Sequence, residues 1–215
     1  GKVSLIKAIK ESCDCYFYNL AQKIGINDIA NMARKFGLGD ITNIELPDEK
    51  DGLVPTKEWK KKNLKENWYT GETLITCIGQ GYLLATPAQI ALMTALIANN
   101  GKKINLTLQK KTNQVNDKKE SIAIKTAHMN IIKDAMFKVV NEPGGTAYRI
   151  RSDFSKYSLS GKTGTSQVKK ITIEDRESED FRKKEIQRKD KDHSLFVGYM
   201  PSSKPKFSIS VVIDH

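Results

Sequence analysis

The chain has 215 residues, of which 39% are hydrophobic and 28% charged, a balance that predicts one globular domain rather than a disordered chain. The net charge of +11 is a weak signal for nucleic acid, because the lysines are spread out and few aromatic side chains lie between them for base stacking. A general attraction to anionic lipid or polymer stays open. The longest apolar stretch, Gln89–Ala98, is too short and too interrupted to span a bilayer.

Helical patterns fill the first two thirds of the chain. Apolar residues at helical spacing predict segments at Leu5–Ile24 with a break at residues 12–15, Ile29–Phe36 after Asn27, Pro87–Ala98 and Thr126–Val140. A loop rich in turn residues is expected at Pro47–Pro55. Cys13, Cys15 and Cys77 cannot form a complete disulfide framework and have no histidine at zinc-ligand spacing, so we expect buried free thiols.

Strand patterns dominate the last third, at Tyr157–Gln167, Ser194–Met200 and Phe207–Ile213. Between the first two lies Lys169–Asp192, where 17 of 24 residues are charged, and this segment is expected to be an exposed connection. Helices first and consecutive strands last predict an α+β fold, an antiparallel sheet with helices packed on it.

The stretch SGKTGTSQ at residues 160–167 suggests two kinds of chemistry. A phosphate loop requires a glycine at position 156, where this chain has Lys156. The alternative is the K-T-G element of serine acyl-transferases. In that reading Lys162 supplies a cation, Thr163 and Thr165 supply hydroxyls, and Gly164 allows close approach of a substrate backbone.

A second candidate element is Ser12-Cys-Asp14, where the first helical pattern breaks. It matches the S-x-N or S-x-D element of the same enzymes, in which the serine relays a proton. Either Ser12 or Asp14 could instead cap a helix N-terminus, and the two readings are compatible.

Together with these elements, further blocks occur in order along the chain: Trp68–Thr73, Gly79-Gln-Gly81, Ala98–Gly101, Gly145-Thr-Ala147 and His193–Pro201. With them the chain resembles the transpeptidase domain of penicillin-binding proteins, and in particular the elongation branch. The resemblance implies a peptidoglycan D,D-transpeptidase that cross-links stem peptides ending in D-Ala-D-Ala, in the periplasm, with an inner-membrane anchor outside these residues. It also implies acylation by β-lactams, other cell-elongation proteins as partners, and no metal, organic cofactor or nucleic acid.

The resemblance assigns roles by position. Ser12 would pass a proton toward the leaving amine, with Lys162 beside it, and Asp14 would contact the substrate. Thr163 and Thr165 would hold the terminal carboxylate, Gly164 would let the substrate approach, and the backbone N–H of Thr165 would be one oxyanion donor.

The nucleophile of the family lies in an S-x-x-K element well upstream of S-x-N. Ser4-Leu-Ile-Lys7 has that spelling, but Ser4 is only eight residues before Ser12. An intervening helix would place the two serines about 12 Å apart, so Ser4 is predicted to be an N-cap. We therefore expect residues 1–215 to form a partial domain without its nucleophile or its final helix, and to be inactive alone.

Two other classes stay open. A β-lactamase or β-lactam sensor shares the S-x-D and K-T-G elements, although the block Trp68–Gln89 favours the biosynthetic branch. A non-catalytic binding module of the cell-wall machinery is the other alternative.

Overall fold

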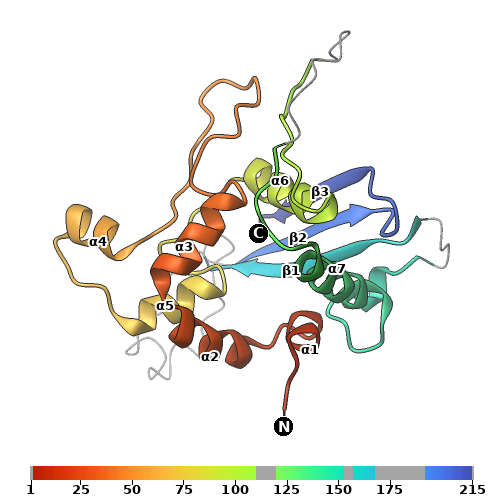
Figure 1. Ribbon diagram of the computed structural model, residues 1–215, viewed down its shortest axis with the longest axis horizontal. Coiled ribbons are helices and arrows are strands. Elements are labelled where there is room, and N and C mark those ends of the chain that lie inside the picture. Colours follow the sequence, from red (N-terminus) through yellow and green to blue (C-terminus); the bar gives the residue numbers. More distant parts are fainter. Residues whose placement is uncertain (1, 110–119, 153–156, 168–191, 215) are drawn as a thin grey trace.

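The computed structural model describes residues 2–109, 120–152, 157–167 and 192–214. Helices come first and strands last (Figure 1). The helices are α1 (Leu5–Lys10), α2 (Asp14–Ile24), α3 (Ile26–Lys35), α4 (Lys57–Leu64), α5 (Thr70–Cys77), α6 (Pro87–Ala98), α7 (Thr126–Asn141) and the short 3-10 helix η1 (Tyr148–Ile150). The strands are β1 (Ser160–Ser166), β2 (His193–Met200) and β3 (Phe207–Ile213). Within these described residues, no helix has both the length and the apolar content needed to cross a membrane.

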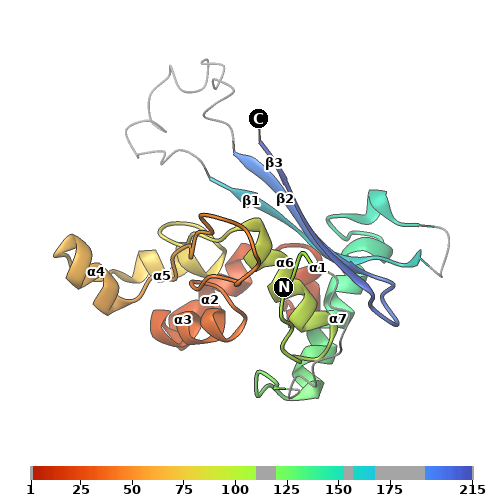
Figure 2. The same cartoon turned by 90° about the horizontal axis from the view of Figure 1, so that it is seen from above.

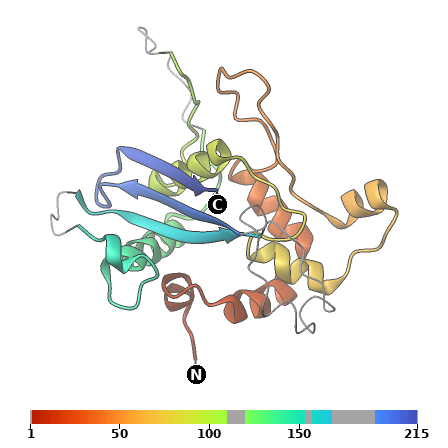
Figure 3. The same ribbon diagram turned by 180° about the vertical axis from the view of Figure 1, so that it is seen from behind.

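The three strands form one antiparallel sheet in the order β1-β2-β3, which confirms the predicted α+β class. The pairing of β1 with β2 runs from Ser160 opposite Tyr199 to Ser166 opposite His193. Helices α6 and α7 pack on one face of this sheet (Figure 2), and the sheet lies in front of them when viewed from behind (Figure 3). Strand β1 is therefore an edge strand within the described part of the chain.

Apolar side chains from three elements fix the sheet on its helices. Tyr199 of β2, which is 1% exposed, packs with Ala98 of α6 and Met136 of α7. Nearby, Val139 and Val140 near the end of α7 form a second buried cluster, against which Phe196 of β2 and Ile9 of α1 pack. Helix α1 is thus attached to the same core as β2.

Four helical segments were predicted close to their observed bounds, because apolar periodicity and capping residues agree there. Thr86 accepts a hydrogen bond from the Gln89 backbone amide, and Pro87 occupies the first turn of α6. Helix α3, expected from Ile29, begins earlier, at Ile26. Gly25, with φ +82°, reverses the chain directly after α2 and lets the next helix start at once. Strand β1 begins at Ser160 rather than Tyr157, where its pairing with β2 starts.

Two α-helices and the short 3-10 helix η1 were missed, and one expectation on the cysteines was wrong. The lysine-rich sequence of α4 has no apolar repeat, and α5 is short and begins inside a block noted only for its family resemblance. The cysteines are free, as expected, but Cys15 is exposed and Cys13 and Cys77 are only partly buried. The expected charged connection, Lys169–Asp192, lies outside the described residues except for Asp192, although the strands on either side of it do pair.

Candidate active site

Ser12 occupies a turn between α1 and α2. Its φ of +55° places it in the left-handed region, which is uncommon for a residue other than glycine. The chain reverses here because the backbone amide of Cys13 bonds back to the Ala8 carbonyl at 2.9 Å. The turn exposes the Ser12 side chain at the end of α1. Strain of this kind is found preferentially at functional sites, where surrounding structure holds it in place.

The capping alternative for Ser12 and Asp14 is wrong. The N-cap of α2 is Cys13, and no side chain accepts a capping hydrogen bond there. Asp14 is instead the first residue of the helix, where its carboxylate is favoured by the helix dipole. Both polar side chains are exposed and available for other contacts.

Lys162 of β1 reaches Ser12 across the molecule. Its Nζ donates to Ser12 Oγ at 3.0 Å and to the backbone carbonyl of Thr163 at 2.7 Å. Burial lowers the pKa of Lys162 from 10.5, and the charge of Asp14 opposes part of this change. The predicted meeting of Lys162 with Ser12 is thus confirmed, and Asp14 belongs to the same electrostatic environment.

Small residues shape β1 around this lysine. An added Cβ at Gly161 would lie 2.3 Å from the ring of Phe196 and 2.6 Å from the Val197 carbonyl oxygen, so a side chain there has no room. An added Cβ at Gly164 would come no closer than 3.3 Å to Leu195. Gly161 therefore serves packing on the sheet, whereas Gly164 is exposed.

Thr163 and Thr165 have different surroundings. The hydroxyl of Thr163 shares a 2.8 Å hydrogen bond with the hydroxyl of Thr146, which follows α7 in the chain. Thr165 is exposed, and its carbonyl oxygen accepts a 2.5 Å hydrogen bond from the side-chain amide of Gln80. Sequence reasoning had given no role to Thr146 or Gln80.

Gln80 contacts β1 as a neighbouring strand would. Its Nε2 donates to the Thr165 carbonyl, and its Oε1 accepts from the Gln167 backbone amide at 3.1 Å. One donor and one acceptor, matched to residues i and i+2 of a strand, reproduce the bonds that the N–H and C=O of a single residue make in a parallel pair. Gly79 and Gly81, with φ of +81° and +74°, form the tight turn that presents this side chain. The two glycines around one polar residue were the signal in the sequence.

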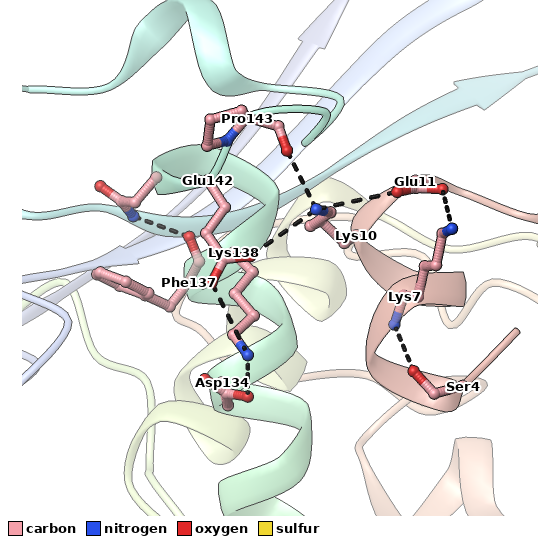
Figure 4. Close-up of polar contacts among 10 residues, drawn as sticks. Ser4, Lys7, Lys10, Glu11, Asp134, Phe137, Lys138, Glu142 and Pro143 are labelled. Atoms are coloured by element: carbon pink, nitrogen blue, oxygen red, sulfur yellow. Dashed lines mark hydrogen bonds and ion pairs between the residues drawn. The ribbon is translucent and has the colours of Figure 1, made fainter.

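Ser4 and Lys7 do not form a nucleophile and base pair. Ser4 is the N-cap of α1, and its Oγ accepts from the Lys7 backbone amide at 3.3 Å (Figure 4). The Lys7 side chain instead approaches Glu11, with 3.9 Å between Nζ and the carboxylate. The interpretation of Ser4 as a helix cap is therefore confirmed.

The assembled site brings together a hydroxyl, a lysine of lowered pKa and a strand edge. A lysine beside a serine hydroxyl can assist the movement of a proton, because its Nζ donates to that hydroxyl and its charge favours the transfer. The exposed edge of β1 can pair with an extended substrate, and the exposed Thr165 lies on it. This combination suits transfer of an acyl group carried by a peptide.

A family model described as the penicillin-binding protein transpeptidase domain matches residues 1–215. The chain belongs to this family. Among curated members it is 36% identical to the peptidoglycan D,D-transpeptidase MrdA of Acinetobacter baumannii, over 99% of this chain and 32% of that protein. It is 35% identical to MrdA of Haemophilus influenzae, over 100% of this chain and 34% of that protein. The chain therefore spans about a third of the length of the penicillin-binding relatives it matches.

Solved structures of penicillin-binding proteins have the same fold. Pseudomonas aeruginosa PBP2 in complex with WCK 5153 superposes with a TM-score of 0.82 at 37% identity, covering 99% of this chain and 44% of that one. The PBP2 of Helicobacter pylori, in complex with MreC, gives a TM-score of 0.81 at 32% identity, covering 100% of this chain and 37% of that one. The expected transpeptidase fold is confirmed.

Proposed function

We propose that the chain is part of a peptidoglycan D,D-transpeptidase that cross-links stem peptides through a serine acyl-enzyme and is a target of β-lactams. The observation that carries this proposal is the 3.0 Å contact between Lys162 and Ser12. It joins the K-T-G and S-x-D elements into one site, as acyl transfer requires. The family membership and the relatives named peptidoglycan D,D-transpeptidase support the same activity.

In this proposal the attacking serine lies outside residues 1–215. Ser4 is occupied as a helix cap, and Ser12 is placed to relay a proton rather than to attack. The proton lost by the nucleophile reaches the leaving D-Ala amine through Ser12, while Lys162 keeps the local field positive. Asp14 contacts the substrate, and the hydroxyls of Thr163 and Thr165 hold the terminal carboxylate.

The backbone N–H of Thr165 is the oxyanion donor in this scheme. A strand residue directs its N–H and C=O to the same edge, and the carbonyl of Thr165 faces Gln80 rather than β2. The N–H of Thr165 is therefore directed to the same exposed edge. The second oxyanion donor would be the N–H of the nucleophilic serine.

The setting is also a proposal. We place the domain in the periplasm, attached to the inner membrane, with other cell-elongation proteins as partners. The complex of Helicobacter pylori PBP2 with MreC and a related peptidoglycan synthase complex, 33% identical over 99% of this chain, support partners of that kind.

The test is covalent labelling by fluorescent penicillin, using the protein in which these residues are joined to the nucleophile. Lys162→Met and Ser12→Ala are expected to slow labelling by about 100-fold or more, the usual range for loss of acid–base catalysis. The matched control is Lys23→Met, which removes an exposed lysine of α2. An unlabelled wild-type protein, or a Lys162→Met variant that labels normally, would contradict the proposed function.

A further inference from the structure

Thr146 touches the candidate carboxylate site without being part of the K-T-G element. Its Oγ1 lies 2.8 Å from Oγ1 of Thr163, 17 residues later in the chain. The bond joins the loop after α7 to β1, directly beside Lys162. A hydroxyl aimed at another hydroxyl can control which way the second one donates, because each carries a single hydrogen.

The loop that carries Thr146 is held on both sides. The backbone amide of Thr146 donates to the Lys10 carbonyl at 3.2 Å, and the amide of Ala147 donates to the Val139 carbonyl at 3.1 Å. An added Cβ at Gly145 would lie 2.2 Å from that same Val139 oxygen, so this path of the chain requires glycine. The position of the Thr146 hydroxyl is therefore determined by the fold rather than by its own rotation alone.

Lys10 fixes the start of the same loop. Its Nζ donates to the Pro143 carbonyl at 3.1 Å and lies 3.8 Å from the carboxylate of Glu142 (Figure 4). The Lys10 side chain is only 17% exposed, which makes these contacts stronger than those of a surface lysine. Lys10 lies two residues before Ser12, so one residue connects the turn of Ser12 with the loop of Thr146.

Counting hydrogens decides the direction of the bond between the threonines. Lys162 Nζ, 3.5 Å from Thr163 Oγ1, can only donate. If Thr163 donated to Thr146, it would present only lone pairs to a carboxylate, and the two would repel. Thr163 can donate to a bound carboxylate only when Thr146 donates to Thr163.

We propose that Thr146 is a positioning residue that makes the Thr163 hydroxyl a donor to the terminal carboxylate of the acyl donor. This inference rests on the proposed function, since it assumes that a carboxylate binds at Thr163. Thr146 itself does not touch the substrate. It acts through Thr163 and sets selectivity for donors that end in a carboxylate.

The experiment compares acylation of the intact enzyme by a penicillin and by the methyl ester of the same penicillin. Thr146→Val keeps the shape of the side chain but removes the hydroxyl. We expect it to slow acylation by the acid about tenfold, the effect of one oriented hydrogen bond to a charged group, and to change acylation by the ester less than twofold. Thr146→Ser should restore the wild-type preference.

Three controls separate this inference from other outcomes. Thr107→Val also removes a hydrogen-bonded hydroxyl, one that donates to Glu45, and should leave both rates unchanged. In a Thr163→Val background, Thr146→Val should have no further effect on the preference. Thr146→Ala provides a second variant if valine prevents folding. Equal slowing for acid and ester, or a serine variant as impaired as the valine variant, would overturn the inference. A wild type that neither compound acylates would instead contradict the proposed function.

Discussion

Lys162 Nζ and Ser12 Oγ are 3.0 Å apart, although 150 residues separate them in the chain. The contact depends on α7, which packs against α1 on one side and against β1 on the other. Ser12 follows α1 directly, and Lys162 lies within β1. A site made in this way responds to changes in the packing of α7 as well as to changes in its own side chains.

The lowered pKa of Lys162 should make stability depend on pH. Below its folded pKa, the buried charged lysine costs stability; that cost is relieved as pH rises through the folded pKa toward 10.5. The free energy of unfolding of wild type minus that of Lys162→Met should therefore increase with pH over this range. In Asp14→Asn the opposing charge is gone, so the increase should begin at lower pH.

Denaturant unfolding at a series of pH values measures this dependence. Asp28→Asn, which changes an exposed carboxylate of α3, is the matched control and should leave the profile unchanged. A wild-type profile parallel to that of Lys162→Met throughout the range would show that the pKa of Lys162 is not lowered.

Gln80 is expected to support catalysis through the backbone of Thr165. Gln80→Leu removes both hydrogen bonds to the edge of β1. Because we propose the backbone amide of Thr165 as the oxyanion donor, acylation should slow about tenfold, less than the loss of the donor itself. Unlike Thr146→Val, this change should slow a penicillin and its methyl ester equally.

The comparison is with Gln22→Leu, which replaces an exposed glutamine of α2. The acylation rate is measured by mass spectrometry of reactions that are quenched at a series of times. Unaltered rates in Gln80→Leu would mean that the strand keeps its position without this side chain.

Two glycines of β1 should respond differently to the same substitution. Gly161→Ala places a methyl group against the Phe196 ring and the Val197 carbonyl, and overpacking of this kind typically costs about 1–3 kcal/mol. Gly164→Ala would meet Leu195 at 3.3 Å, a tight contact that a shift of a few tenths of an ångström relieves, and should lower the unfolding temperature less than Gly161→Ala. Thermal unfolding of both variants tests this prediction. An equal decrease in the unfolding temperature of the two variants would refute the packing role of Gly161.

Lys60 connects α4 with α5, the two α-helices that were not predicted from the sequence. Although it is a lysine, it is 1% exposed, and its Nζ contacts Glu72 of α5 at 2.5 Å and Glu66 at 3.2 Å. Lys60→Met leaves these carboxylates without their cation and should lower the unfolding temperature. Lys61→Met, at the exposed neighbouring position, should not, and a similar effect of both changes would contradict a specific role for Lys60.

The sequence predicted those parts of the site in which chemistry and local structure coincide. Lys162 lies in a strand of small residues, and Ser12 lies where a helical repeat breaks, so both were recognisable. The roles of Gln80 and Thr146 come from tertiary packing. Gln80 bonds to a residue of β1 that lies 85 positions later in the chain, and Thr146 to one that lies 17 positions later. A local pattern does not contain such a contact.

The same reasoning explains the missed helices. Helix α4 contains Lys60, whose burial depends on two carboxylates from later in the chain. Read alone, a lysine-rich segment indicates a solvated surface. The position of α4 in the fold is determined by ion pairs, and the spacing of apolar residues in the sequence does not predict them.

The tight fit of Gly161 beneath Phe196 also limits how such an enzyme could evolve. If the protein is a β-lactam target, as we propose, selection by the drug would favour changes that weaken acylation by the drug but keep cell-wall synthesis. The strand that carries Lys162 has little room for them, since a larger residue at Gly161 would damage the sheet. Heritable resistance would then arise mainly at residues that hold this strand from outside, and Gln80 and Thr146 are two examples.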